Sequence, residues 1–166
     1  SSAASDVYKR QDELNAISID AGAGDDVVDL AGLDPSTFPD LIDTEISVSG
    51  GDGADSITGS DLADSLFGDA GDDTIDGGLA DDSVWGGDGH DSLLGGAGDD
   101  VISGELDDDT LFGGDGHASL LGGVGADNAN GEQGNDTLVG DAGAALLNGS
   151  GKHLTIEQAI GEGRFV

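Results

Sequence analysis

The sequence predicts an all-β solenoid, and three features of one short repeat predict it. Aspartate follows the first glycine of most repeats by five residues, and an apolar residue follows that aspartate by two, as in Gly86, Asp91 and Leu93. A fixed short period that keeps three chemically different positions in phase is typical of stacked coils. Glycine returns at every ninth residue, at Gly50, Gly59, Gly68, Gly77, Gly86, Gly95, Gly104, Gly113, Gly122, Gly131, Gly140 and Gly149.

Each nine-residue unit divides into a loop and a strand. Its last three residues place an apolar side chain between two mostly polar ones, which is the alternation of a strand with one buried face. These apolar positions run from Ile57 to Ile156, and Ala129 is the smallest of them. We expect them to fill a thin core between two sheets, so metal binding must supply much of the folding free energy.

The first six residues of each unit have the chemistry of a calcium loop. Glycine permits the left-handed backbone that turns carbonyl groups toward an ion, and calcium prefers carboxylate and carbonyl oxygens. We therefore predict several Ca²⁺ ions, held by nine aspartates and by the loop glycines around them. The predicted metal-site residues are Asp55, Asp64, Asp73, Asp82, Asp91, Asp100, Asp109, Asp127 and Asp136, with Gly51, Gly53, Gly71, Gly87, Gly89, Gly96, Gly98, Gly114 and Gly116.

Written as G-G-x-G-x-D-x-U-x, with U a large apolar residue, the unit resembles the haemolysin-type calcium-binding nonapeptide repeat of RTX (repeats-in-toxin) proteins. Residues 86–103 match it at every defined position, and twelve units run from Gly50 to Glu157 without insertion. The resemblance implies a parallel β-roll, a right-handed β-solenoid with two units per coil. It also implies that loop n stacks on loop n+2 with calcium between them, and that the chain is a fragment of a larger secreted protein.

Stacking of every second loop sorts the aspartates into two columns. We expect the odd-numbered loops to form the better calcium ladder and the even-numbered loops to weaken at Ala118. The odd loops supply Asp55, Asp73, Asp91, Asp109 and Asp127, then Ala145; the even loops supply Asp64, Asp82, Asp100, Ala118, Asp136 and Leu154.

The fourth position of the unit departs from glycine at Leu62, Ala80, Asp107 and Lys152. If this position needs a left-handed backbone, each departure costs about 1–2 kcal/mol. Asp107 would suffer least, because aspartate tolerates that conformation. Lys152 places a cation where a cation site would be, so we expect the twelfth unit to bind nothing.

The charge of the chain bears on its partners. It has 36 acidic and 4 basic residues and a net charge of −32, so without counterions it should repel itself and stay disordered. Ten loop pairs could hold at most ten Ca²⁺ ions, which would leave a charge of roughly −12. Nucleic acid and anionic membrane are disfavoured as partners. Cysteine is absent, which excludes disulfides and thiolate metal sites.

The pattern divides the chain into four segments. Residues 1–11 lie outside it and are interpreted as an extraneous or disordered N-terminal segment. Residues 12–49 hold a degenerate repeat and an excursion or cap, and residues 50–157 form the roll of twelve units. Residues 158–166 are a tail or the start of a next module. Residues 17–28 echo residues 46–57, so residues 21–29 are interpreted as an additional unit. Residues 30–45 contain both prolines, and we expect them to leave the roll and to cap its open end.

Two further groups of side chains have predicted positions. His90 and His117 fall in different loop columns, which argues against a transition-metal histidine cluster and favours solvent-facing side chains. Position nine places Phe67 and Trp85 on adjacent coils of one sheet, a stripe on which a neighbouring domain of the same parent chain could dock.

The leading functional hypothesis is a non-enzymatic calcium-binding module that folds outside the cell, where calcium is near millimolar. Export from bacteria by type I secretion follows from the resemblance. Two alternatives stay open: a structural repeat segment of a large calcium-dependent adhesin, and the C-terminal module of a secreted hydrolase whose catalytic domain is absent from these residues. No catalytic residue is predicted, because His90, Asp91 and Ser92 are neighbours in sequence and not a spatial triad.

Overall fold

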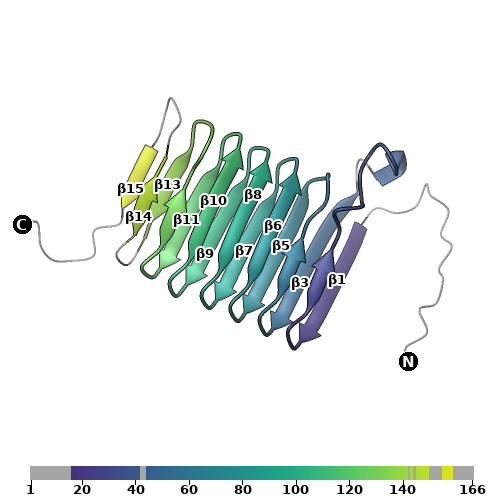
Figure 1. Ribbon diagram of the computed structural model, residues 1–166, viewed down its shortest axis with the longest axis horizontal. Helices are drawn as coiled ribbons and strands as arrows, with labels where there is room; N and C mark the ends of the chain where they lie inside the picture. Colours follow the sequence, from purple (N-terminus) through teal and green to yellow (C-terminus); the bar gives the residue numbers. More distant parts are fainter. Residues whose placement is uncertain (1–15, 42–43, 142, 144, 150–154, 159–166) are drawn as a thin grey trace, which may run out of the picture.

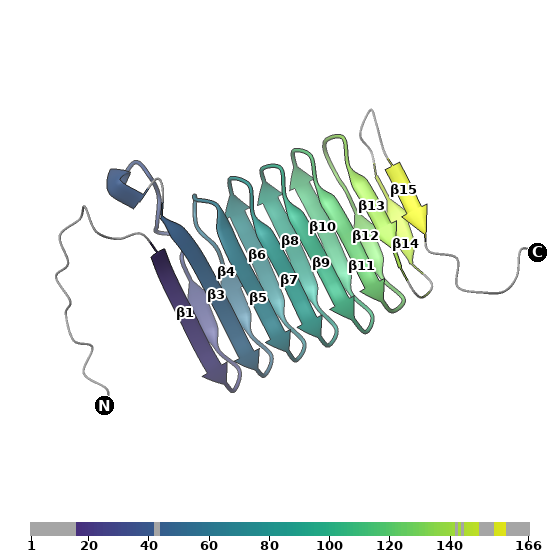
Figure 2. The same ribbon diagram turned by 180° about the vertical axis from the view of Figure 1, so that it is seen from behind.

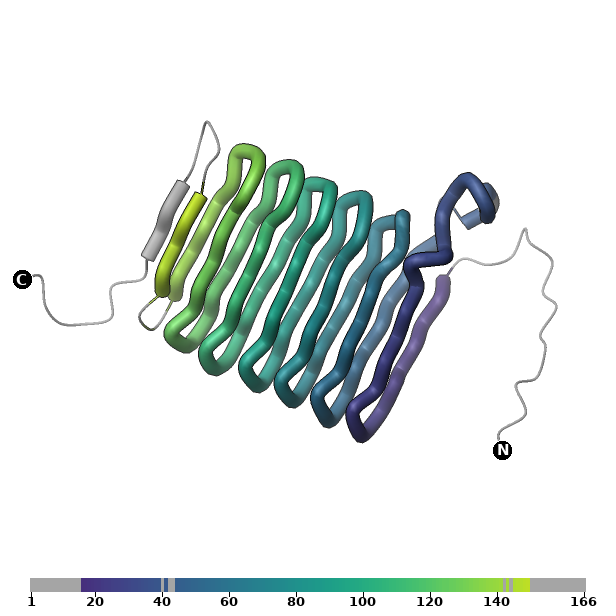
Figure 3. Tube along the Cα trace, viewed as in Figure 1, coloured from purple at the N-terminus to yellow at the C-terminus, as the bar shows by residue number. Residues whose placement is uncertain are grey.

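The computed structural model describes residues 16–41, 44–141, 143, 145–149 and 155–158, and these form a parallel β-roll (Figure 1). The chain alternates between two facing sheets, so every second strand in sequence is a neighbour within one sheet. The coils are flattened and stack side by side along one axis (Figure 3). The predicted all-β parallel roll is confirmed.

Sheet A contains the odd-numbered strands and sheet B the even-numbered ones (Figure 2). Sheet A consists of β1 (Ala16–Ala23), β3 (Glu45–Asp52), β5 (Asp64–Ala70), β7 (Ser83–Asp88), β9 (Val101–Leu106), β11 (Ser119–Val124), β13 (Thr137–Gly140) and β15 (Thr155–Gln158). Sheet B consists of β2 (Val27–Asp29), β4 (Ser56–Thr58), β6 (Thr74–Leu79), β8 (Ser92–Ala97), β10 (Thr110–Asp115), β12 (Asn128–Asn130) and β14 (Leu146–Asn148).

The strand register equals two repeat units along most of the roll. Trp85 lies opposite Phe67 on one side and Ser103 on the other, an offset of 18 residues in each direction. In the first coil the offset is 29, because Ile17 lies opposite Ile46 and Val28 opposite Ile57. The first coil is therefore eleven residues longer, and the additional length lies between β2 and β3.

The segment between β2 and β3 leaves the roll at one edge and contains the short 3₁₀ turn η2 (Pro39–Leu41). Asp34 organises its bend, since its Oδ1 accepts the N–H groups of Ser36 (2.9 Å) and Thr37 (2.8 Å). Hydrogen bonds from these two residues, first that of the Ser36 side chain, lower the pKa of Asp34 to about 2. Leu30 packs against the core, which ties the segment to the roll.

The core is one layer of apolar side chains between the sheets. Position eight of each unit points inward, and the flanking positions point mostly outward, as the alternation predicted. Ala129 is fully buried where other coils carry larger residues, so it is the thin layer of the core. The buried row consists of Val48, Ile57, Leu66, Ile75, Val84, Leu93, Ile102, Leu111, Leu120, Ala129 and Leu138.

The outer face of sheet A carries the predicted aromatic pair. The rings of Phe67 and Trp85 stack with their centroids 4.6 Å apart and their planes at 4°. Their placement on adjacent coils is confirmed, whereas a docked domain remains a prediction. In the part of the chain that the structure describes, no helix is long and apolar enough to cross a membrane.

Candidate metal site

All nine predicted aspartate ligands are buried at the inner side of the loops. Their exposed fractions lie between 1% and 3%, although aspartate is ordinarily one of the most exposed residues. They form two columns, one at each edge of the roll, because successive loops turn at opposite edges. A buried carboxylate is strongly unfavourable unless hydrogen bonds or a cation compensate for it.

In eight of the nine carboxylates, one oxygen accepts a hydrogen bond from the previous coil. Asp73 Oδ1, for example, accepts the backbone N–H of Asp55 at 2.7 Å, and Asp91 Oδ1 accepts that of Asp73 at 2.9 Å. The same bond is made by the Oδ1 atoms of Asp55, Asp82, Asp100, Asp109, Asp127 and Asp136, at 2.8–3.1 Å.

The second oxygen has no such partner. Among the described residues, nine buried Oδ2 atoms accept no hydrogen bond, and eight of them belong to the predicted ligands. Each can accept about two further bonds in its ionised form, and an unsatisfied buried charged group costs at least about 1–3 kcal/mol. These atoms belong to Asp26, Asp55, Asp73, Asp82, Asp91, Asp100, Asp109, Asp127 and Asp136.

Backbone carbonyl oxygens converge on the same points. A Cβ atom placed on Gly50 would lie 2.4 Å from Asp55 Oδ2 and 2.8 Å from the carbonyl oxygen of Gly68, one coil further on. Gly95 shows the same cradle in the other column, with Asp100 Oδ2 at 2.4 Å and Gly113 O at 2.7 Å. The first glycine of the repeat is thus required by space rather than by a left-handed backbone. The donor set, one carboxylate oxygen beside carbonyl oxygens, suits calcium.

Most of the other loop glycines do adopt the left-handed backbone. All nine glycines predicted to shape the metal site have positive φ, between 96° and 157°. Ala80 and Asp107 take φ of 72° and 70° at position four, so the expected strain applies to them. Leu62 avoids positive φ and belongs to a differently built loop. Lys152 and Leu154 lie outside the described residues.

Burial raises the pKa of seven of these carboxyl groups and so makes them harder to ionise. It is the main cause that raises the pKa of Asp73 to about 6, of Asp109 to about 7 and of Asp82 to about 8, and neighbouring aspartates add to the shift. Burial also raises the pKa of the carboxyl groups of Asp64, Asp91, Asp100 and Asp127. A divalent cation beside each Oδ2 would reverse this effect, because it favours the ionised form.

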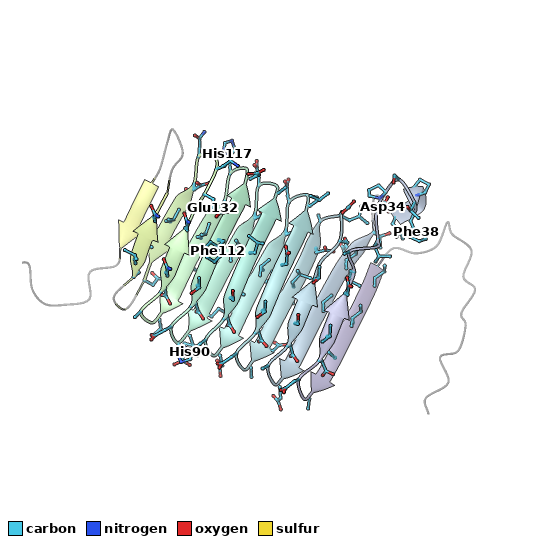
Figure 4. The ribbon with its side chains drawn as sticks, viewed as in Figure 1. Asp34, Phe38, His90, Phe112, His117 and Glu132 are labelled. Atoms are coloured by element: carbon cyan, nitrogen blue, oxygen red, sulfur yellow. The ribbon has the colours of Figure 1, made fainter. Side chains whose placement is uncertain are left out.

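No three His, Cys, Asp or Glu side chains come together to hold an ion anywhere in the described part of the chain. The oxygens that lie beside the aspartate Oδ2 atoms are the backbone carbonyls of the first glycines, as at Gly68 and Gly113. His90 and His117 are exposed at opposite edges of the roll (Figure 4), as expected from their columns. His117 is part of the loop stacking, since its Nδ1 accepts the N–H of Asn135 at 3.0 Å.

These features define a class of protein: a parallel β-roll whose loops repeat one oxygen-lined cradle at every coil. A comparison with protein families matches residues 18–32, 49–84, 85–120 and 112–147 to the RTX calcium-binding nonapeptide repeat, in four copies. The matches cover more than half of the chain, so the chain belongs to this family, whose β-roll is a structural calcium-binding module. A search of curated proteins finds no match.

Asp26 is the site residue that the sequence-based prediction missed. Its Oδ2 is buried without a partner, and its N–H donates to Asp55 Oδ1 at 2.8 Å, so it extends the odd column by one coil. The signal lay in the echo between residues 17–28 and 46–57, which aligns Asp26 with Asp55. Carrying the ligand assignment across the inserted segment would have found it.

Proposed function

We propose that this RTX module folds when calcium enters both loop columns, and that its ligands are the carboxylates with an unpartnered Oδ2. The observation that carries the proposal is the set of nine such atoms, spaced one coil apart in the odd column and interrupted by one coil, at Ala118, in the even column. The predicted aspartates other than Asp64 belong to it, and Asp26 joins them.

Different atoms of the loops have different roles in holding the ions. The aspartate Oδ1 atoms fix each carboxylate to the previous coil, and the Oδ2 atoms and first-glycine carbonyls provide oxygen ligands. Calcium supplies positive charge within a chain of net charge −32. Since the apolar core is one layer thick, the binding free energy of several ions becomes folding free energy.

The biological setting follows from this coupling. A chain that stays extended where calcium is scarce can be exported, and it folds where calcium is near millimolar, the range of weak extracellular sites. The RTX repeat is typical of secreted proteins, which supports a secreted location for the parent protein. We propose that the module stabilises that parent after export.

The test is far-UV circular dichroism of the chain during a calcium titration, with magnesium as the control ion. We expect a cooperative change from coil to β structure with calcium only. Asp91→Asn should raise the calcium midpoint by about tenfold or more, since a lost bond to a charged group is worth about 1.5–3 kcal/mol. The matched control is Asp88→Asn in the same loop, where the side chain is exposed. A chain that is equally β-structured in chelator would overturn the proposal.

A further inference from the structure

The second loop of the roll is nearly a copy of the first. Loop one reads Gly50-Gly51-Asp52-Gly53-Ala54-Asp55, and loop two reads Gly59-Ser60-Asp61-Leu62-Ala63-Asp64. The two differ only at positions two and four. Gly51 and Gly53 have φ of 109° and 136°, whereas neither Ser60 nor Leu62 has positive φ, so these two changes give the loop another path.

Ser60 supplies the carboxylate of its own loop with hydrogen bonds. Its N–H donates to Asp64 Oδ2 at 2.6 Å, and its Oγ lies 3.0 Å from the same oxygen and 3.2 Å from Oδ1. The hydroxyl oxygen in turn accepts the N–H of Leu62 at 3.1 Å. Ser60 is 1% exposed and Asp64 3%, so the group is closed to solvent. Among the nine predicted aspartate ligands, only Asp64 has a hydrogen-bond partner for its Oδ2.

The surroundings hold this loop in place from both sides. Asp61 donates its N–H to Leu33 O at 3.1 Å, which joins the loop to the segment between β2 and β3. Leu79 of the following coil donates its N–H to Ser60 O at 3.1 Å. Leu62 is 6% exposed, so an apolar side chain fills space at the position where loop one has glycine.

We propose that Ser60 takes the place of a cation at Asp64, so that the even column begins with a metal-independent anchor and not with a calcium ligand. The inference rests on the proposed function, because it assumes that the unpartnered Oδ2 atoms elsewhere are the calcium ligands. The N–H and the hydroxyl of Ser60 provide hydrogen bonds to the buried Asp64 Oδ2, so this oxygen has partners without an ion. Ser60 and Leu62 thereby determine where the calcium ladder of this edge starts.

The number of calcium ions bound at saturation tests this directly, measured on the full chain by native mass spectrometry and by isothermal titration. Asp64→Asn should bind as many ions as the parent chain, with its midpoint changed less than twofold. Asp73→Asn, which removes a buried carboxylate at a similar depth in the odd column, should raise the midpoint about tenfold and lower the number bound.

The converse variant restores the sequence of loop one. Ser60→Gly with Leu62→Gly should bind one additional ion, and adding Asp64→Asn to this pair should remove it again. If Asp64→Asn in the parent loop loses an ion as Asp73→Asn does, Ser60 is not a substitute for the cation. If the restored loop does not fold, the comparison of Asp64→Asn with Asp73→Asn still decides. A parent chain that binds no calcium would instead refute the proposed function.

Discussion

The two edges of the roll share one backbone and differ in their carboxylates. The odd column presents six successive aspartates with unpartnered Oδ2 atoms, from Asp26 to Asp127. The even column begins with the hydrogen-bonded Asp64, is interrupted at Ala118 and resumes at Asp136. At Ala118 the strand ladder continues nevertheless, since Thr137 N donates to Ala118 O at 2.9 Å.

The comparison shows that the features that form the coil are not the features that form the metal site. Backbone hydrogen bonds and the inward apolar residue continue through a unit that lacks aspartate. Leu120, two residues after Ala118, is fully buried and lies opposite Leu138. The carboxylate can therefore be absent from a coil while the strand is kept. The Ala118 side chain has no polar atom that needs a partner, but it also provides no acceptor for the N–H of Asp100, as Asp100 Oδ1 does for the N–H of Asp82.

The largest expected effect of a single substitution comes from filling a first-glycine cradle. In Gly86→Ala the new Cβ would lie 2.1 Å from Asp91 Oδ2 and 2.9 Å from Gly104 O, so the carboxylate must move. Gly113→Ala is the matched change at the gap of the even column, where the neighbours are Ala118 Cβ and Gly131 O, both at 2.7 Å. Overpacking costs about 1–3 kcal/mol at both sites, and the odd-column variant should lose calcium affinity in addition.

Urea unfolding in saturating calcium and the calcium midpoint by circular dichroism together measure the two effects. We expect Gly86→Ala to raise the midpoint about tenfold and Gly113→Ala to change it much less. Equal midpoints for the two variants would show that the carboxylate in the cradle does not matter for calcium.

The repeat predicted the fold and the buried aspartates because both depend on strict periodicity. Asp91 is recognisable from its phase alone, and so is the inward position of Leu93. Asp26 was missed because an eleven-residue insertion hides its phase. The echo of residues 17–28 in residues 46–57 restores that phase, and the pairing of β1 with β3 has the same offset. The bonding of Asp64 was hidden for another reason: a serine two residues into a loop gives no sign that it will be buried and turned toward a carboxylate.

A moderate gain in calcium affinity is expected when an aspartate replaces Ala118 in the even column. In Ala118→Asp the new carboxylate can accept the N–H of Asp100, as Asp100 Oδ1 accepts that of Asp82 at 2.9 Å. With calcium present, one additional charged ligand should lower the midpoint by up to about tenfold. With chelator present, the added buried charge should make the folded state less stable.

Ala118→Asn is the control, since it has the same size and can make the same bond without the charge. Circular dichroism in calcium and in chelator separates the two roles. If Asn and Asp lower the midpoint equally, the improvement comes from the hydrogen bond and not from calcium.

The smallest expected effect is that of pH on the amount of β structure in the absence of calcium. The pKa of Asp73 is raised to about 6, of Asp109 to about 7 and of Asp82 to about 8, chiefly by burial, above the ordinary value of 3.8. Groups with a raised folded-state pKa stabilise the fold fully below their unfolded value, and this contribution is lost as pH rises through the folded value. In chelator, the β signal should therefore be greater at pH 4 than at pH 8, with the loss beginning just above the ordinary pKa of 3.8 and complete near pH 8.

Asp82→Asn sharpens this prediction, because the amide resembles the protonated acid in shape and stays neutral at every pH. In chelator this variant should keep more β structure at pH 8 than the parent chain, and the two should converge at pH 4. In calcium the order should reverse, since the variant lacks one charged ligand of the even column. A parent chain in chelator that loses β structure on acidification would contradict the burial of neutral carboxyl groups in the roll.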